Sequence, residues 1–340
     1  MPGHDIVVVG ASAGGVEALI KLVSGFPADL PASVFIVLHI PAQSPSLLPG
    51  ILSRSGPLQA AHPSEGEAIQ QGRIYIAPPN LHMLLEAGYI HLVRGPKENR
   101  HRPAIDPLFR SAAAAYGPQV VGVILTGSLD DGAAGLLAIK RLGGVAIVQD
   151  PQEALYPGMP TSALQHVKVD HTLLLSEIGA VLARLAREPV IGEGNHLIPE
   201  DMELEVRMAE MDMDALNNGE TVGTPSVFSC PECGGVLWEI KDGELTRYRC
   251  RVGHAFSTES IIAAQAERLE DALWAALKTL EESANLCRNL AQQARERDQN
   301  WLVQRFEARL REAEHRAELI RSVLFQDKLL PTIDLAATQD

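Results

Sequence analysis

The first 190 residues alternate short apolar runs with segments whose apolar positions recur every three or four residues. Apolar, β-branched runs occupy residues 6–9, 34–38, 73–77, 89–93, 120–125 and 145–148. Helical periodicity occupies residues 15–25, 106–116, 133–142 and 176–187. Continuous apolar strands separated by helices are typical of a parallel sheet covered on both faces. We therefore expect an α/β domain at 1–189 with a doubly wound, mostly parallel, Rossmann-like sheet. The Pro-Pro-Asn turn after the third run allows one antiparallel piece.

The pattern changes at about residue 189. Residues 190–227 are rich in Glu, Asp, Gly and Asn, which predicts an acidic linker with one short helix at about 199–211. A cysteine module follows at 228–257. Residues 258–328 form two helical stretches, joined near 297–299, whose apolar residues recur at alternating steps of three and four. This heptad spacing favours a helical hairpin or a dimeric bundle. We expect the module and the helices to form a second, smaller domain for assembly or regulation.

Length and charge narrow the class of protein. The chain has 340 residues, is 46% hydrophobic and carries a formal net charge of −14, and its length favours two units. No apolar run reaches the roughly 18–20 residues of a membrane span, and the start lacks the features of a signal peptide. We therefore expect a cytoplasmic protein without a membrane span. Of the 29 Lys/Arg and 43 Asp/Glu, residues 1–190 hold 13 and 15. The acidic excess of the remainder argues against nucleic acid as a partner.

A glycine-rich turn, Gly10-Ala11-Ser12-Ala13-Gly14-Gly15, joins the first predicted strand to the first helix. It fits the Gly-x-Ser-x-Gly pattern, in which small neighbours permit a sharp turn and leave the serine hydroxyl beside helix N–H groups. Ser12 is therefore a candidate nucleophile. The same glycines could instead cradle a phosphate or allow close packing. A dinucleotide fingerprint, however, needs glycine where Ser12 stands, and no Gly-Lys-Ser/Thr follows.

A serine nucleophile needs a base within hydrogen-bond reach and an acid that orients the base. His39 directly follows the second predicted strand, and Asp130 and Asp131 follow a later one. Because the carboxyl ends of parallel strands meet at one edge of a sheet, these side chains can converge there with Ser12. Spacing does not distinguish Asp130 from Asp131, and either could instead cap the next helix. A lone histidine after a strand is more often a polar loop or core residue.

At these positions, residues from about 5 to 187 resemble the catalytic domain of the chemotaxis protein-glutamate methylesterases. Several blocks agree in order and approximate spacing: Gly10-Ala11-Ser12-Ala13-Gly14-Gly15, Leu38-His39, Tyr75-Ile76-Ala77-Pro78, Asn99-Arg100-His101-Arg102-Pro103, Leu125-Thr126-Gly127, Asp131-Gly132-Ala133-Ala134-Gly135 and Gly158-Met159-Pro160. The resemblance implies a serine hydrolase, without a catalytic cofactor, that removes methyl groups from glutamate γ-methyl esters on chemoreceptor helices. Some relatives also deamidate receptor glutamines.

By motif match, the resemblance makes Ser12 the nucleophile, His39 the general base and Asp131 the orienting carboxylate. It implies an oxyanion hole that includes the N–H groups of Ala13 and Ser128. Arg100 and Arg102 are expected at the border of the substrate cleft, facing the acidic receptor, although a lone basic turn is usually just an exposed loop. Met159 is expected in a structural turn at the cleft. We also expect Asp106 to cap the helix that follows the basic turn.

Three departures from the family pattern bear on activity. Ala13 stands where the family usually has Thr or Ser. The aspartate loop reads Gly127-Ser128-Leu129-Asp130-Asp131-Gly132 instead of Gly-Met-Gly-x-Asp-Gly, so Leu129 replaces a glycine and is expected to reshape the turn. The usual N-terminal receiver domain is missing, which suggests constitutive activity or control by a separate response regulator. A degenerate enzyme that only binds receptor or partner proteins, or a nucleotide-binding protein, are the alternative interpretations.

The four soft or borderline ligands of the cysteine module have the spacing of a zinc ribbon. Cys230 and Cys233 form Cys-x-x-Cys, and Cys250 and His254 form Cys-x-x-x-His. Four ligands complete a tetrahedral site, so we expect a structural zinc ion; a catalytic thiol pair is the alternative. Cys287 falls on the heptad seam and is expected in a small apolar core. The module lies in an acidic region, which favours docking or homo-oligomer formation, together with the C-terminal helices, over nucleic-acid binding.

Overall fold

The computed structural model describes residues 3–43, 45–190, 197–210 and 223–325. The chain divides into two compact units, Met1–Ile261 and Ile262–Asp340. Expectations for 191–196 and 211–222 of the linker, and for 326–328 of the second helical stretch, lie outside the described residues. Among the described helices, none is both long enough and apolar enough to cross a membrane.

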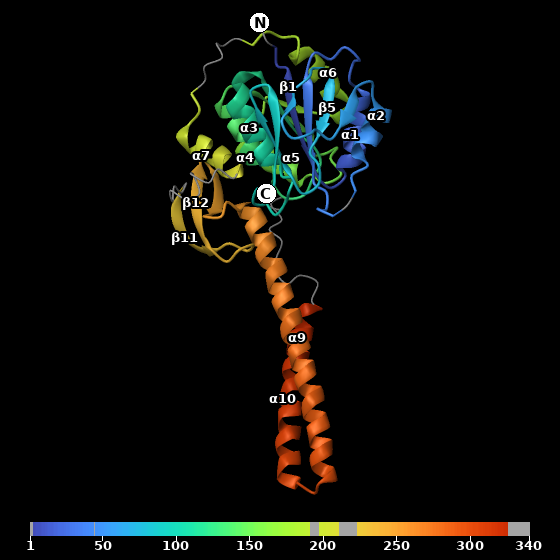
Figure 1. Ribbon diagram of the computed structural model, residues 1–340, viewed down its shortest axis with the longest axis vertical. Helices are drawn as coiled ribbons and strands as arrows, with labels where there is room; N and C mark the ends of the chain where they lie inside the picture. Colours follow the sequence, from blue (N-terminus) through green and yellow to red (C-terminus); the bar gives the residue numbers. More distant parts are fainter. Residues whose placement is uncertain (1–2, 44, 191–196, 211–222, 326–340) are drawn as a thin grey trace. The chain divides into compact units, whose positions relative to one another are not determined.

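A seven-stranded parallel sheet forms the centre of the first unit (Figure 1). Its strands, in spatial order, are β10 (His171–Leu173), β9 (Val145–Gln149), β8 (Val120–Ile124), β1 (Ile6–Ala11), β2 (Ser33–Leu38), β5 (Arg73–Ile76) and β3 (Gln59–Ala61). The chain builds outward from β1 on one side and then returns to add β8 on the other, which makes the β1–β8 boundary the switch point. Ligands of doubly wound sheets bind at the carboxyl edge of such a point.

Helices cover both faces of this sheet, as the sequence predicted. One layer holds α1 (Gly15–Ser24), α2 (Leu48–Ser55) and α6 (Leu175–Leu185); the other holds α3 (Ile105–Tyr116), α4 (Ala133–Arg141) and α5 (Gly158–His166). A short 3₁₀ turn, Gly117–Gln119, links α3 to β8. Alternate residues of β1 enter opposite layers, because Val7 and Val9 pack with the first and Val8 with the second. This arrangement confirms the doubly wound α/β fold.

Two helices differ from the sequence-based expectation. α2 was not predicted, and Gly158-Met159-Pro160 is not a turn but the first part of α5. Both helices carry proline and glycine in their first turn. The first N–H groups of a helix have no partner within the helix, so proline costs little there. The proline and glycine residues of these two segments were therefore interpreted as signs of a loop, although each segment is the start of a helix.

Two antiparallel sheets complete the first unit. β4 (Glu67–Ala68), β7 (Tyr89–Val93) and β6 (His82–Glu86) form a three-stranded sheet, the antiparallel piece that the Pro-Pro-Asn turn allowed. The segment after the linker, which we call the ribbon, holds β11 (Thr224–Ser229), β12 (Val236–Asp242), β13 (Leu245–Cys250) and β14 (Ala255–Ser257). Before the ribbon, α7 (Glu200–Ala209) buries Met202 against the second core layer.

The second unit, which begins at Ile262, is a helical hairpin made by α9 (Thr258–Glu296) and α10 (Asn300–Leu324); the first turn of α9, which includes Ser260, belongs to the first unit. Ion pairs Arg288–Glu314 and Arg321–Glu281 fix its antiparallel register. Apart from Leu277, the buried side chains of its seam are small: Ala284, Cys287, Ala291, Ala294, Ala313 and Ala317. Cys287 thus lies in the small apolar core where the heptad spacing placed it.

Candidate active site

Ser12 lies in the turn between β1 and α1. Gly14 ends this turn in the left-handed conformation, with φ 71°, and a side chain there would approach Leu155 and the Thr126 hydroxyl. The backbone N–H of Ser12 donates to the carbonyl oxygen of Thr126 over 3.0 Å, and the N–H of Gly15 donates back to the Ser12 carbonyl over 2.9 Å. These bonds hold the serine at the carboxyl edge of β1 and β8.

The structure brings Ser12, His39 and Asp131 together. Nδ1 of His39 lies 3.1 Å from Ser12 Oγ, and Nε2 lies 2.7 Å from Oδ2 of Asp131. The side chains of His39 and Asp131 are only 6% and 4% exposed, so water does not compete strongly for the imidazole. The ring faces the opposite way from the familiar serine-protease triad, in which Nε2 faces the serine. Either ring nitrogen can accept a hydroxyl proton while the other remains bonded to the carboxylate.

Asp131 is fixed by three further donors. Its carboxylate accepts hydrogen bonds from the backbone N–H groups of Ile105 (2.8 Å) and Asp106 (3.3 Å), at the start of α3, and from the side-chain amide of Asn99 (2.9 Å). Burial raises the pKa of Asp131, but the hydrogen bond and charge of His39, with the Ile105 and Asn99 bonds, bring that pKa below its usual range. The carboxylate is therefore ionised at neutral pH.

The other two aspartates at this edge also have partners outside the triad. The sequence suggested that Asp106 caps its own helix, and this was wrong, because Asp106 lies in the first turn of α3. Its carboxylate accepts hydrogen bonds from the N–H groups of Gly132 and Gly135, so it caps α4 instead. Burial, together with the charge of Asp131, raises the pKa of Asp106 well above its usual value. Asp130 accepts a hydrogen bond from the hydroxyl of Ser257, 2.6 Å away. Geometry therefore separates Asp130 from Asp131, which spacing could not.

His101 contacts the candidate base, a relationship that sequence reasoning missed. Its ring lies nearly parallel to that of His39, with the centroids 3.6 Å apart and the planes inclined by 11°. Burial and the neighbouring His39 lower the pKa of His101 to about 3, so His101 is neutral at physiological pH. The only sequence signal was its place in the block Asn99-Arg100-His101-Arg102-Pro103.

A cleft of about 540 Å³ opens over Ser12. It is lined by Ser12, Ala13, His39, Ile40, Pro41, Ala42, Asn80, Lys97, Arg100, His101 and Arg102. Arg100 and Arg102 thus border the cleft, as expected. Arg102 also ties the loop together, because its guanidinium donates to Asn80 Oδ1 and to the carbonyl of Gly95. Lys97 adds a third cation to the rim, which suits an acidic partner surface.

Ser128 and Met159 occupy different positions around Gly127. Met159 is 1% exposed, and its N–H donates to the Gly127 carbonyl over 2.9 Å, so it packs beneath the aspartate loop and outside the cleft lining. Ser128 is exposed on that loop. Within the described part of the chain, the N–H groups of Ala13 and Ser128 have no hydrogen-bond acceptor. They are available to bind an oxyanion.

Leu129, which stands where the family usually has glycine, adopts φ 60°. The loop therefore keeps a left-handed residue although leucine lacks the conformational freedom of glycine. Next to it, a side chain at Gly158 would come within 3.0 Å of the Leu129 N atom. The first residue of α5 thus packs closely against the backbone of the aspartate loop.

The ribbon gathers Cys230, Cys233, Cys250 and His254, whose ligand atoms all lie within 4.8 Å of one another. Sγ of Cys233 and Cys250 are 3.7 Å apart, and Cys250 Sγ lies 3.5 Å from His254 Nδ1. A tetrahedral zinc ion with bonds of about 2.3 Å to sulfur and 2.0 Å to nitrogen requires separations of about 3.8 and 3.5 Å. The donor set and its spacing fit a zinc ion.

Comparison with known proteins identifies the N-terminal half. The family model described as CheB methylesterase matches residues 7–182. A protein-glutamate methylesterase/protein-glutamine glutaminase 2 from Methanosarcina mazei is 35% identical over 192 residues, which cover 54% of this chain and 52% of that protein. A putative protein of the same description from Leptospira interrogans is 38% identical over 183 residues, 54% of this chain and 95% of its own. The match therefore spans about half the length of the first relative.

A solved structure agrees with these relatives. The crystal structure of the Thermotoga maritima CheB methylesterase catalytic domain is 32% identical, with a TM-score of 0.52, and covers 53% of this chain and 98% of that one. The resemblance drawn from the motif blocks is thereby confirmed for the parallel-sheet domain. The chain belongs to the CheB methylesterase family.

Proposed function

We propose that this protein is a protein-glutamate methylesterase, a serine hydrolase that cleaves glutamate γ-methyl esters of chemoreceptors. The observation that supports this function best is the hydrogen-bonded series Ser12, His39 and Asp131, of which Ser12 and His39 line a cleft rimmed by cations. Membership of the CheB methylesterase family supports the ester as substrate. Because receptor helices that carry such esters face the cytoplasm, we place the enzyme there.

In the proposed reaction, Nδ1 of His39 takes the proton of Ser12 while Oγ attacks the ester carbonyl carbon. The N–H groups of Ala13 and Ser128 hold the oxyanion that forms. The carbon–oxygen bond to the methoxy group then breaks, and His39 gives its proton to the departing methanol. Asp131, held ionised, stabilises the intermediate imidazolium.

The second half of the reaction repeats these steps with water. His39 takes a proton from water, whose oxygen attacks the acyl-enzyme carbonyl, and the proton returns to Ser12 Oγ as the glutamate carboxylate leaves. The same steps on a glutamine side chain would release ammonia instead of methanol. Deamidation of receptor glutamines is therefore part of the proposal, in keeping with the description of the relatives.

The direct test is methanol release from methylated chemoreceptor fragments by the wild type and by Ser12→Ala. We expect release by the wild type and a loss of about 10⁴-fold or more in the variant, because the covalent route is removed. Turnover that survives in Ser12→Ala would refute the nucleophile. A wild type that releases no methanol from fragments that another methylesterase demethylates would refute the function.

A catalytically degenerate module that binds receptor or partner proteins is the second candidate. The observation that favours it is Leu129 at φ 60°, in the loop that carries Ser128 and Asp131. A fluorophosphonate probe, which bonds to a serine oxygen only when that serine is activated, separates the two candidates. Rapid labelling of Ser12 supports the enzyme, whereas absence of labelling supports the degenerate module.

We further propose that the ribbon holds one structural zinc ion through Cys230, Cys233, Cys250 and His254. The ion would leave no open coordination position and therefore takes no part in catalysis. It would fix the two knuckles of a sheet that is too small to be stable by its own apolar core.

We also propose that the helical hairpin joins copies of this chain. Its seam buries mainly alanines, while larger apolar side chains stay outside: Leu269, Trp274, Leu286, Trp301 and Leu319 are 40% to 65% exposed. Light scattering on the full chain tests the proposal, and a mass equal to one chain would refute it. Control by a separate response regulator stays a prediction from the resemblance.

A further inference from the structure

Asn99 joins the ribbon to the acid of the triad. Its side-chain nitrogen donates to Asp131 Oδ1 (2.9 Å) and Asp106 Oδ2 (2.8 Å), and its side-chain oxygen accepts from the backbone N–H of Ser257 (2.9 Å) and the hydroxyl of Ser260 (3.1 Å). A backbone N–H can only donate. The amide oxygen must therefore face the ribbon, which directs the NH₂ group at the two carboxylates.

The backbone around Asn99 is held by the same segment. The N–H of Asn99 donates to the carbonyl of Ala255 over 2.8 Å, and the N–H of Ala255 donates to the carbonyl of Lys97 over 3.3 Å. Asn99 has φ 47°, an uncommon left-handed conformation that persists only where the surroundings impose it. Asn99 is 5% exposed and Ser260 fully buried, so water cannot replace these partners without rearrangement.

Buried ion pairs next to Asn99 connect the ribbon to α3. Glu98 accepts from Arg110 of α3 (2.8 Å) and from Arg249 of β13 (2.9 Å). Burial raises the pKa of Glu98, but the two guanidinium groups hold it below its usual range. An ionised, buried carboxylate that shares two arginines gives this junction one defined geometry.

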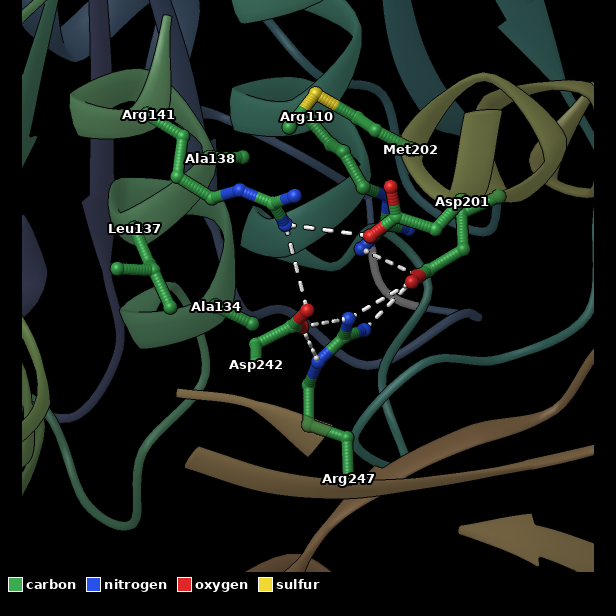
Figure 2. A pocket seen from close by; sticks show the side chains of 10 residues that line it. Arg110, Ala134, Leu137, Ala138, Arg141, Asp201, Met202, Asp242 and Arg247 are labelled. Atoms are coloured by element: carbon green, nitrogen blue, oxygen red, sulfur yellow. Dashed lines mark hydrogen bonds and ion pairs between the residues drawn. The ribbon is translucent and has the colours of Figure 1, made fainter. Parts of the chain in front are cut away.

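A second carboxylate extends the ion pairs to the linker helix. Glu205 of α7 accepts from Arg247 (2.7 and 2.8 Å) and from Arg249 (2.9 Å). Figure 2 shows Asp242 and Arg247 directed toward each other, with Arg110 of α3 nearby, where α3, α7 and the ribbon meet. These ion pairs connect α3, α7 and β13, which are far apart in sequence. The next strand, β14, pairs with β13 and contacts Asn99.

We propose that Ser257 and Ser260 are positioning residues of the esterase: through Asn99 they orient the Asp131 carboxylate, so that the ribbon and the first turn of α9 complete the triad. The inference rests on the proposed function only for the activity of the triad. Neither serine lines the cleft, so both act through Asn99. The metal-ligand group lies next to this contact, because His254 directly precedes Ala255 and its carbonyl accepts from the Cys250 N–H over 2.9 Å.

The test compares Ser260→Ala with Ser226→Ala in the full chain. Ser226 is a matched control: its hydroxyl donates to the Leu237 carbonyl over 2.8 Å inside the ribbon, away from Asn99. The readouts are the second-order rate of fluorophosphonate labelling of Ser12 and the kcat and KM of methanol release. We expect Ser260→Ala to lower the labelling rate and kcat about tenfold with KM unchanged, because one buried acceptor loses its donor. Ser226→Ala should behave as the wild type.

A double-mutant cycle separates positioning from general damage. In an Asn99→Ala background the same Ser260→Ala change should have no further effect on labelling, because its route to Asp131 is already broken. Additive losses, wild-type rates in Ser260→Ala, or an equal loss in Ser226→Ala would each overturn the proposal. Labelling needs no receptor, so normal labelling without methanol release would contradict the proposed function alone. A wild type that is not labelled would overturn both.

Discussion

The imidazole of His101 lies flat against that of His39, with ring centroids 3.6 Å apart. Because burial and the neighbouring His39 lower the pKa of His101 to about 3, this neighbour stays uncharged at neutral pH. In the proposed reaction, a neutral ring face against His39 shields that ring from water and stabilises the imidazolium. We therefore expect His101 to favour the proposed proton transfer without competing for the proton.

The effect of a substitution at His101 on the labelling rate of Ser12 should therefore depend on whether the new side chain has a flat ring, and not on whether it can carry a charge. His101→Phe keeps a flat ring and should stay within about threefold of the wild-type labelling rate, whereas His101→Ala should lose about tenfold. The pH profile of labelling between pH 5 and 8 should keep its shape in His101→Phe, because His101 does not titrate there. A profile that changes shape would mean that His101 itself carries a proton in this range.

Asp130 should make stability depend on pH. Burial raises its pKa to about 7, against the hydrogen bond from Ser257, while an unfolded aspartate titrates near about 3.9. Between about pH 4 and pH 7 the folded protein keeps a proton that the unfolded chain has lost. The free energy of unfolding should therefore fall as pH rises through this window and level off above it.

Asp130→Asn removes this titration but keeps an oxygen for the Ser257 hydroxyl. We expect a flatter pH dependence and a variant more stable than the wild type above pH 7, by on the order of a few kcal/mol at most. Urea unfolding at pH 5, 6, 7 and 8 measures the free energy of unfolding of both proteins. Asp29→Asn is the control, since the Asp29 side chain is 82% exposed. Parallel curves for Asp130→Asn and the wild type would contradict the raised pKa.

Removing one ligand of the metal group should release the metal and loosen the ribbon. Native mass spectrometry should find one zinc ion per chain in the wild type and none in Cys250→Ser, with the unfolding temperature lowered by several degrees. Cys287→Ala is the matched control, because Cys287 is buried in the α9–α10 seam and should leave the zinc content unchanged. A folded wild-type protein without metal would reject the site.

Local patterns predicted the parts of the molecule whose partners are near in sequence or fixed by topology. Ser12, His39 and Asp131 each follow a strand of the parallel sheet, and the topology of such a sheet brings strand ends together. The four metal ligands follow from two short motifs.

Contacts between distant segments could not be read in the same way. Asn99 meets Ser257 and Ser260, which follow it by 158 and 161 positions, and no periodicity encodes such a pair. Asp130 was ambiguous because its partner, Ser257, lies in a segment outside the family match. The ion pairs of Glu98 with Arg110 and Arg249 bury charges that composition would place on the surface.

Leu129 offers the sharpest test of the aspartate loop, because its φ of 60° suits glycine and disfavours other residues. Leu129→Gly should match or exceed the wild type in free energy of unfolding, since relief of backbone strain offsets the greater entropy of the unfolded chain. Leu129→Val should be less stable by about 1–2 kcal/mol, because a branched Cβ tolerates this conformation worst. Urea unfolding ranks the wild type and the two variants by stability. The rates of Ser12 labelling should have the same ranking, since the same loop carries the Ser128 N–H and Asp131. If Val proves as stable as Leu, the loop does not hold a left-handed residue at this position, and the departure from the family pattern has another explanation.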